Sequence, residues 1–422
     1  MLKQESLRSG LVRLAVPRSE LVLCLVILVV ALLIHRLNLD PKFNGPDAIS
    51  NFKFAQYGQD WGYWWNPDAF WGYQFPMGYG TFLALVGHVT GGSLVLAQYL
   101  QILLALCMAP LGWLLTRHLG KTVRVLTFAA IALNPSVFYL ARNNGYEILI
   151  SFFMLLATAL LWGYGGKPPS EKTHVQKMLP SLAGVAMALC MMSQGKTIII
   201  LPVLIYLAWK WGKLQTLLFL VFSFSLPALW AIRNHFVLDR WNPFNSSSDI
   251  VFWMGNNPTT ATGEYVISPP PLPAGFSSYY AAGLDFIVSQ PERAYSLFLF
   301  RMVRLLEPTY FYPDWSSFKG ANLALHVAMI VSSIIGASLF AAYLLGRLWV
   351  RPPLIPAVGP IAIIVVLFFL VHIPFATETR HTKPIVPLAL CVAVPTFVFL
   401  VRRVRHAHLA RNRNSDLAPL NN

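Results

Sequence analysis

Residues 354–375 read LIPAVGPIAIIVVLFFLVHIPF, an apolar run without a single Asp, Glu, Lys or Arg residue. A run of roughly 17 to 25 such residues lets a helix cross the hydrocarbon core of a bilayer, because each residue adds about 1.5 Å. The whole chain is 56% hydrophobic and only 12% charged, whereas soluble domains carry about a quarter charged residues. The sequence therefore predicts an integral membrane protein.

Comparable apolar runs recur along the chain, at 20–37, 94–116, 122–140, 146–164, 214–232, 323–346 and 384–401. The segment 179–211 is too long for one crossing, and the polar stretch Ser193-Gln-Gly-Lys196 divides it, so we expect two spans there. The expected fold is all-α and polytopic, a single membrane domain over 1–422 with about ten transmembrane helices. A signal peptide is the alternative for residues 1–37, but the long run without a small-residue cleavage site favours a retained helix.

The net charge of +15 is distributed unevenly along the chain. With the N-terminus inside, the expected topology assigns 19 of the 32 Lys and Arg residues to the cytoplasmic side but only four of the 17 acids, so that side carries the whole +15. The charge thus reflects the positive-inside bias, and no nucleic-acid partner is expected. The basic tail 402–422 is interpreted as a topology anchor that touches anionic lipid. We expect a multi-pass protein of the plasma (inner) membrane with both termini in the cytoplasm.

Two segments on the outward side are long, 38–93 and 233–322. The first is rich in aromatic residues, and the second ends in an amphipathic stretch at 283–306, so both are expected to contain helices that lie at the membrane interface. Because the cytoplasmic loops are short, we expect the functional residues, including those of a catalytic first loop, on the outward, extracytoplasmic side.

Asp47 is the first candidate for chemistry, in a short polar turn, Gly45-Pro-Asp-Ala-Ile-Ser-Asn51, that follows the first span. A carboxylate at the membrane boundary could take a proton from a substrate hydroxyl. It could equally cap the helix that follows, as Asp often does. From spacing alone the two roles are evenly balanced.

Four further ionisable residues fall at breaks or outward ends of the expected helices: Glu147, Lys196, Arg233 and Arg380. Such residues near lipid are costly, and they indicate function by default. The three cations suit a phosphate group at the interface, because charge-assisted contacts to phosphate are strong. Singly, each cation is more often an interface anchor, and Glu147 is more often an acid that complements a helix dipole.

The histidines and cysteines show no metal-ligand spacing, so no metal site is expected, although a hard cation held by carboxylates is left open. All four cysteines lie in apolar runs and indicate no disulfide framework. The chain also has no phosphate-cradling glycine-rich loop and no Ser-His-Asp arrangement.

Several motifs, taken in order, resemble the glycosyltransferase-C superfamily, in particular the branch of protein O-mannosyltransferases and lipid A aminoarabinose transferases. They are Pro46-Asp-Ala-Ile, Phe75-Pro-Met-Gly-Tyr-Gly, Leu133-Asn-Pro, Ser193-Gln-Gly-Lys196, Leu226-Pro-Ala-Leu-Trp-Ala-Ile-Arg-Asn, Trp253-Met-Gly-Asn-Asn-Pro-Thr-Thr-Ala-Thr-Gly, Gln290-Pro-Glu-Arg and Thr379-Arg-His-Thr-Lys-Pro. The resemblance covers nearly the whole chain. Ala48 departs from it, because the family usually has a second acid there, and Gln74 and Phe75 replace another frequent acid.

The resemblance implies an inverting glycosyltransferase that uses a polyprenyl-phosphate sugar. Asp47 would be the catalytic base, and Lys196, Arg233 and Arg380 would hold the donor phosphate. Glu147 and the loop that contains Asn256 and Asn257 would line the sugar or acceptor pocket. The acceptor is left open among lipid, polysaccharide and protein.

Two other functions remain open. A flippase or transporter of lipid-linked glycans would also be polytopic and carry cationic sites, but such proteins usually have charged sites near the bilayer midplane. A ligase or polymerase of lipid-linked polysaccharide would use the same chemistry with another donor. The concentration of ionisable residues at outward helix ends favours a one-sided enzyme.

Overall fold

The computed structural model describes residues 17–37, 56, 77–90, 94–142, 145–162, 173–244, 248–262, 270–306, 319–345, 354–376 and 378–416. Every regular element in these ranges is a helix, and they contain no β-strand. The expected all-α fold is therefore confirmed. Asp47 and most of the first outward segment, including 38–55 and 57–76, lie outside the described residues.

All the apolar runs found in the sequence form helices. Six helices in the described ranges are long and apolar enough to cross a membrane: α2 (Arg18–Leu37), α6 (Leu94–Thr116), α10 (His174–Ser193), α12 (Lys213–Leu238), α16 (Lys319–Leu344) and α18 (Val386–Asp416). Shorter apolar helices lie between them: α5 (Met77–Thr90), α9 (Glu147–Trp162), α11 (Leu201–Trp209) and α17 (Leu354–Leu370). The chain is a multi-pass membrane protein, and the count of about ten spans stays a prediction.

The run 122–140 is expected to form one span, and the structure shows a bend within it. It forms α7 (Lys121–Ala132) and α8 (Pro135–Arg142), which meet at an angle of 43° and together count as a seventh candidate span. The break lies at Asn134, whose side-chain oxygen accepts a hydrogen bond from the Ser136 amide at 2.8 Å. Pro135 then takes the first helical position, where its missing N–H costs nothing.

The polar break predicted at Ser193-Gln-Gly-Lys196 is present. Helix α10 ends at Ser193, and the 3₁₀ helix η4 (Gly195–Ile200) leads into α11. Helix α5 packs closely against this break, because a Cβ placed on Gly78 would lie only 2.6 Å from Ser193 Oγ. Helix α5 thus packs on the break from outside, and within the break Thr197 Oγ1 donates to the Gln194 carbonyl at 2.8 Å.

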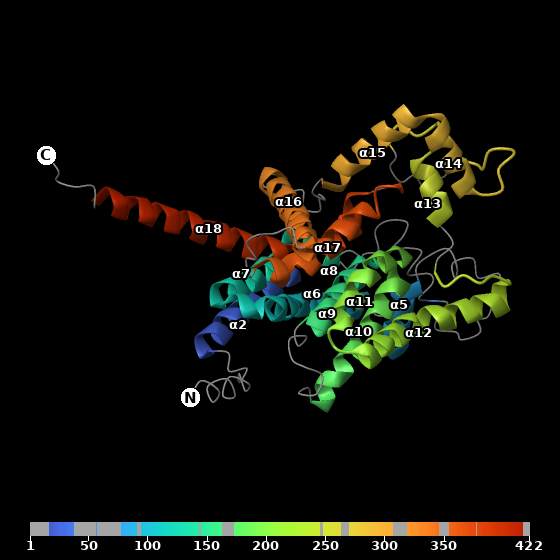
Figure 1. Ribbon diagram of the computed structural model, residues 1–422. Helices are drawn as coiled ribbons and strands as arrows, with labels where there is room; N and C mark the ends of the chain where they lie inside the picture. The colour runs from blue at the N-terminus through green and yellow to red at the C-terminus, as the bar shows by residue number, and fades with distance from the viewer. Residues whose placement is uncertain are drawn as a thin grey trace.

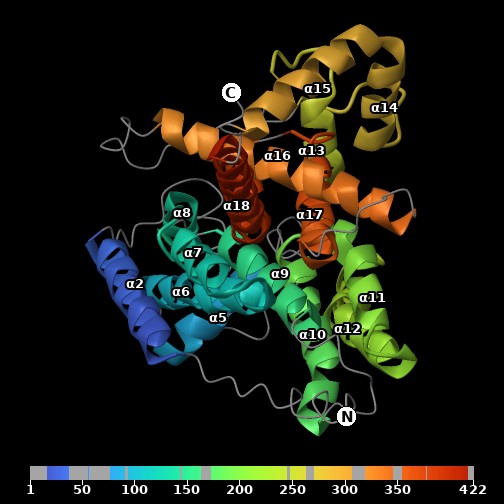
Figure 2. The same ribbon diagram turned by 60° about the vertical axis from the view of Figure 1, so that its left-hand side comes forward.

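The core of the bundle surrounds α9, most of whose side chains are buried. Helices α6 and α10 pack on α9, and α12 packs on α10, while α16, α17 and α18 pack against one another. Figures 1 and 2 show these two groups of helices side by side. A polar contact within the first group joins α5 to α6 and α8, since Tyr79 donates to Gln101 at 3.0 Å and Gln101 donates to the Ala141 carbonyl at 3.4 Å.

Helices α13 (Ser248–Gly255), α14 (Tyr279–Ser289) and α15 (Pro291–Leu306) project together from the bundle above α17 (Figures 1 and 2). The expected single amphipathic stretch 283–306 is divided, because a break at Gln290 separates α14 from α15. Helix α15 is amphipathic: Ala294, Leu297, Arg301 and Leu305 form its buried face. Its placement at the membrane interface stays a prediction.

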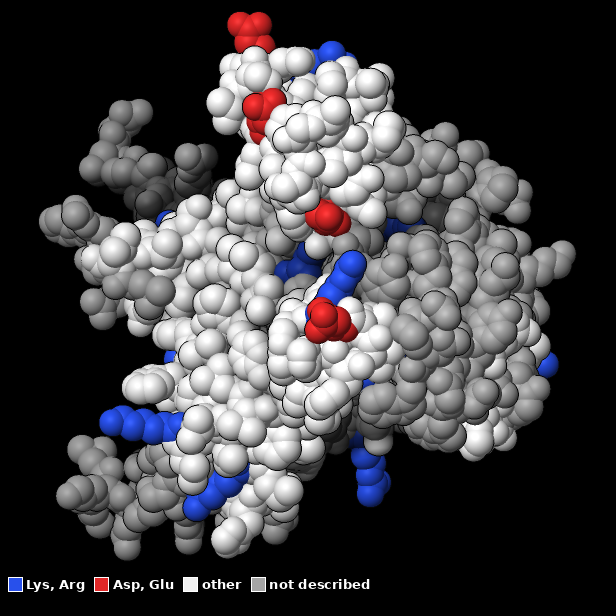
Figure 3. Space-filling model, turned by 90° about the vertical axis from the view of Figure 1, so that its right-hand side faces the viewer, with Lys and Arg blue, Asp and Glu red and all other residues white. Residues whose placement is uncertain are grey.

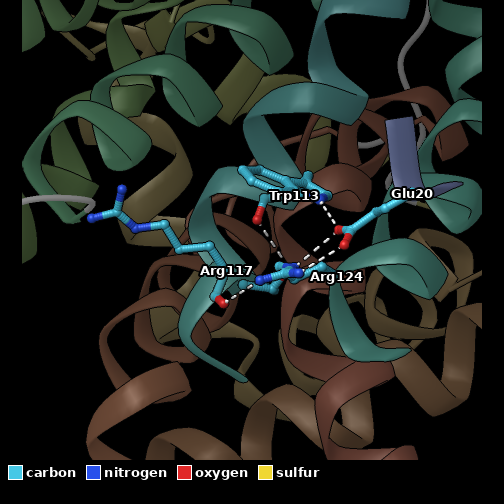
Figure 4. Close-up of polar contacts among 5 residues, drawn as sticks. Glu20, Trp113, Arg117 and Arg124 are labelled. Carbon is cyan, nitrogen blue, oxygen red and sulfur yellow. Dashed lines mark hydrogen bonds and ion pairs between the residues drawn. The ribbon is translucent and has the colours of Figure 1, made fainter. Parts of the chain in front are cut away.

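A clasp formed by Glu20, Trp113 and Arg124 ties α2 to the bundle (Figure 4). The Glu20 carboxylate accepts from Arg124 Nη2 at 2.8 Å, from Arg124 Nε at 3.1 Å and from Trp113 Nε1 at 2.8 Å. Arg124 also donates to the carbonyl of Arg117, which begins the 3₁₀ helix η2 (Arg117–Leu119), at 3.3 Å. Much of α2 faces outward along its length, and this clasp attaches its first turn to α6 and α7.

The basic C-terminal segment continues α18 as one helix as far as Asp416, and this end extends well beyond the bundle in Figure 1. Its residues Arg402, Arg403 and Arg405 are exposed. An exposed cationic helix is compatible with the expected contact to anionic lipid, which stays a prediction.

Candidate functional site

The side chains of Arg380 and Glu147 lie close together, although the two residues are far apart in the sequence. Arg380 lies in the 3₁₀ helix η6 (Thr379–Ile385), which leads into α18. Its Nε lies 2.6 Å from Glu378 Oε2 and 3.6 Å from Glu147 Oε1. Glu147 is nearly fully buried, so its pairing with a guanidinium offsets the cost of burying a carboxylate. Glu147 thus serves both as the acid that opens α9 and as a partner of Arg380.

Lys196, at the break between α10 and η4, is partly buried and lies over the ring of Phe375, with Nζ 3.9 Å from the ring centroid. Within the ranges that the structure describes, its ammonium makes no hydrogen bond or ion pair; the Phe375 ring is its recorded contact. An ammonium over an aromatic face is attracted to the ring and still has N–H donors to offer to another group. Lys196 is therefore available to an anion in a way that Arg380, which has two carboxylates beside it, is not.

Two buried histidines complete the cluster around Lys196. The rings of His372 and His381 stack with their centroids 5.6 Å apart, and Lys196 lies within electrostatic range of both. His372 Nδ1 donates to the Phe368 carbonyl at 2.7 Å, and His381 Nδ1 accepts from the Glu378 amide at 3.2 Å. The buried Nε2 of His372 has no hydrogen-bond partner among the described residues.

Arg233 belongs to the helix that packs on α10, and α10 ends at the break before Lys196. It lies near the end of α12, with its guanidinium 4.8 Å from the centroid of the Trp230 ring and with Nη1 donating to Asn234 Oδ1 at 2.9 Å. Trp230 lines a small cavity together with Gly195, Met77, Met191, Met192, Pro243 and Phe244. Since Gly195 precedes Lys196, this mostly apolar cavity adjoins the Lys196 cluster.

Asn256 and Asn257 are buried, and the structure engages both amides with protein groups. Asn256 donates to the carbonyls of Phe252 at 2.8 Å and Pro374 at 2.7 Å, and it accepts from Arg301. Asn257 caps the end of α13 by donating to the Trp253 carbonyl at 2.8 Å, and it accepts from the backbone and the hydroxyl of Thr259. These bonds give both residues a structural task, and their expected contact with a sugar or acceptor stays a prediction.

The face drawn in Figure 3 is hollowed near its centre, with Lys or Arg side chains visible inside the hollow and Asp or Glu side chains close by. Across the described ranges, no group of three or more His, Cys, Asp and Glu side chains is placed to hold a metal ion. Asp47, the expected base, lies outside the described residues. Its placement relative to the cations stays a prediction.

Sequence reasoning missed three residues of this cluster, Phe375, His372 and His381. The two histidines were visible as ionisable residues beside a short outward turn, but they lacked ligand spacing and so drew no role. The aromatic side chain beneath Lys196 gave no signal, because Phe375 looks like one more apolar residue at the end of a span.

The structure resembles an archaeal oligosaccharyltransferase, AglB from Archaeoglobus fulgidus. The apo form aligns with a TM-score of 0.52 and 16% sequence identity, over 96% of this chain and 52% of AglB. The complex with an inhibitory peptide and a dolichol-phosphate aligns with a TM-score of 0.51 and 16% identity, over 94% of this chain and 52% of AglB. The form tethered to an acceptor peptide aligns with a TM-score of 0.50 and 15% identity, over 91% of this chain and 50% of AglB.

AglB is a glycosyltransferase of the C type, so the likeness confirms the glycosyltransferase-C fold that the motifs predicted. The present chain spans about half the length of AglB. No protein-family model matches the sequence, and no curated protein matches it by sequence. The likeness to O-mannosyltransferases and aminoarabinose transferases within this fold stays a prediction.

Proposed function

We propose that this protein is an inverting glycosyltransferase that moves a sugar from a polyprenyl-phosphate donor to an acceptor hydroxyl on the extracytoplasmic side of the membrane. The observation that carries the proposal is the cation Lys196, which lies at a helix break in a glycosyltransferase-C fold and, among the described residues, contacts the Phe375 ring rather than an anion. A lipid phosphate would supply the missing anion. AglB, with the same fold, has been captured with a dolichol-phosphate, which supports a lipid-linked donor here.

The phosphate is the leaving group in this reaction. As the bond between the anomeric carbon and the phosphate oxygen breaks, negative charge grows on the phosphate. A preorganised cation then binds the transition state more tightly than the ground state and lowers the barrier. Lys196 would take this role, and Arg233 and Arg380 would assist from the neighbouring helix ends.

The acceptor needs a base. Asp47 would take the proton of the acceptor hydroxyl while the hydroxyl oxygen attacks the anomeric carbon from the face opposite the phosphate. The configuration at that carbon is therefore inverted, and polyprenyl phosphate leaves. Glu147 would hold Arg380 in place and border the sugar pocket. A positioned base of this kind contributes about 10²- to 10⁴-fold to the rate.

The test is transfer from a radiolabelled polyprenyl-phosphate sugar by the detergent-solubilised protein, with wild type compared with Asp47→Asn. We expect product without any membrane gradient, and a loss of about 10²-fold or more in the variant. Asp285→Asn is the matched control, because Asp285 is exposed on α14. Transfer by Asp47→Asn at the wild-type rate would show that the base is assigned wrongly, and movement of lipid-linked glycan across vesicles without product would indicate a transporter.

A further inference from the structure

Arg301 is a buried cation outside the Lys196 cluster that nothing in the proposed reaction uses. It lies on the buried face of α15 with 2% of its surface exposed. Burial lowers the pKa of Arg301 to about 10, so the guanidinium stays charged at neutral pH. Within the described ranges its recorded partners are two neutral oxygens at the end of α13: Nη1 donates to the Gly255 carbonyl, and Nη2 donates to Asn256 Oδ1 at 3.2 Å. The C-terminal end of a helix carries partial negative charge, so a cation there is favourable.

The end of α13 in turn holds residues 374–376. Asn256 donates to the Pro374 carbonyl at 2.7 Å, and the Ala376 amide donates to the Val251 carbonyl at 3.0 Å. The two backbones lie so close that a Cβ on Gly255 would stand 2.7 Å from the Ala376 nitrogen. We call this arrangement of Arg301, Gly255, Asn256 and residues 374–376 the α13 clamp.

Phe375 lies inside the clamped segment. Its ring is the one on which the Lys196 ammonium rests, at 3.9 Å, and it also meets the ring of Phe252 from α13, with the centroids 5.8 Å apart. The position of Phe375 is therefore set by α13 on one side, and that position in turn supports Lys196. A continuous series of contacts therefore connects Arg301 to Lys196, the cation proposed to hold the donor.

One turn after Arg301, α15 also contacts the element that carries the second cation. Thr382 Oγ1, in η6, donates to the Leu305 carbonyl at 3.0 Å, and η6 also carries Arg380. Helix α15 thus touches the supports of both Lys196 and Arg380. A shift of this helix would displace both cations together.

We propose that Arg301 is a positioning residue for binding of the lipid phosphate, acting through the α13 clamp and the Phe375 ring on Lys196. This rests on the proposed function only in taking Lys196 as the phosphate ligand. Arg301 itself does not touch the donor. Its two-pronged guanidinium reaches two oxygens at once, which the single ammonium of a lysine cannot reproduce.

The experiment combines two readouts on the full chain in detergent. The first is hydrogen–deuterium exchange of the Ala376 amide, which reports opening of the clamp. The second is equilibrium binding of a fluorescent polyprenyl phosphate. For Arg301→Gln we expect faster exchange and binding weaker by about tenfold, which corresponds to about 1.4 kcal/mol. For Arg301→Lys, both the exchange rate and the affinity should fall between those of Arg301→Gln and wild type. The matched control is Arg293→Gln, on the same helix but exposed, with a bond to the Thr260 carbonyl.

Phe375→Leu separates the clamp from the ring. It keeps the backbone bonds of residues 374–376, so exchange at Ala376 should match wild type, while binding should weaken as in Arg301→Gln. Phe375→Leu also tests the link between the Phe375 ring and Lys196 if Arg301→Gln does not fold. Unchanged exchange in a folded Arg301→Gln would overturn the clamp, and unchanged binding in Phe375→Leu would overturn its link to Lys196. If binding follows these expectations but wild type makes no glycosylated product, the proposed transfer is wrong and the positioning role stands.

Discussion

Two charged clusters of this protein each place a cation over an aromatic ring, but in the described ranges a carboxylate lies beside the cation in one of them and not in the other. In the clasp at the start of α2, Glu20 accepts three hydrogen bonds from Arg124 and Trp113. In the cluster at the α10 break, Lys196 has only the Phe375 ring as a recorded contact, with no carboxylate beside it in the described ranges. A satisfied buried ion pair is a structural element, whereas a cation held without an anion indicates a ligand site. The contrast predicts that changes in the clasp affect stability and that changes in the cluster affect binding.

The largest effect is expected for Glu20→Ala. The variant leaves Arg124 and the Trp113 indole without their acceptor, and removing one partner of a buried ion pair costs about 3 kcal/mol. Thermal unfolding of the detergent-solubilised protein should show this loss, while the affinity for polyprenyl phosphate among folded molecules stays at the wild-type value. The control is Glu292→Ala, which removes an exposed acid from the first turn of α15. A large loss of affinity with unchanged stability would reverse the roles given to the two clusters.

Arg380→Ala should produce an intermediate and mixed effect. It removes the partner of the buried Glu147 and of Glu378, so we expect a loss of stability of about 2 kcal/mol together with weaker binding of polyprenyl phosphate. Unfolding and binding would be measured on the same preparations, with the exposed Arg240→Ala as the control. Unchanged values for both quantities would mean that Arg380 is an interface anchor.

Glu378→Gln should have the smallest effect. Glu378 makes the shortest ion pair of the cluster, 2.6 Å to Arg380, but a third of its side chain is exposed. Solvent screens such a pair, so the loss of stability should remain below about 1 kcal/mol. A loss comparable with that of Glu20→Ala in the same unfolding assay would show that burial is a poor guide to the strength of these pairs.

The sequence predicted the helices well, because apolar length and polar breaks are local properties of the chain. The interruption at Ser193-Gln-Gly-Lys196 was found this way. The bend between α7 and α8 was missed, although Asn134 followed by Pro135 is a helix-start signal, since the apolar run continues through it. A hydropathy pattern does not distinguish a bent span from a straight one.

The sequence predicted several residues of the candidate site but not the contacts between them. Lys196, Arg380 and Glu147 were found because each is an ionisable residue near lipid. The pairing of Arg380 with Glu147, and the bond from Asn256 to Pro374 across 118 positions, depend on tertiary contacts that leave no local pattern. The Gly-Asn-Asn motif was recognised as a landmark but expected at a pocket. Its glycine and first asparagine make room for, and bind, the backbone of residues 374–376, and the expected pocket stays a prediction.

The central claim is that Lys196 binds the phosphate of a lipid-linked donor, and equilibrium binding of polyprenyl phosphate to Lys196→Ala tests it most directly. Lys210→Ala is the matched control, because Lys210 also lies over an aromatic ring, 4.7 Å from the centroid of Tyr206, but is exposed at the end of α11. We expect Lys196→Ala to bind about thirtyfold more weakly than wild type, equivalent to about 2 kcal/mol, with no loss of stability. Equal affinity in wild type and Lys196→Ala would contradict the claim.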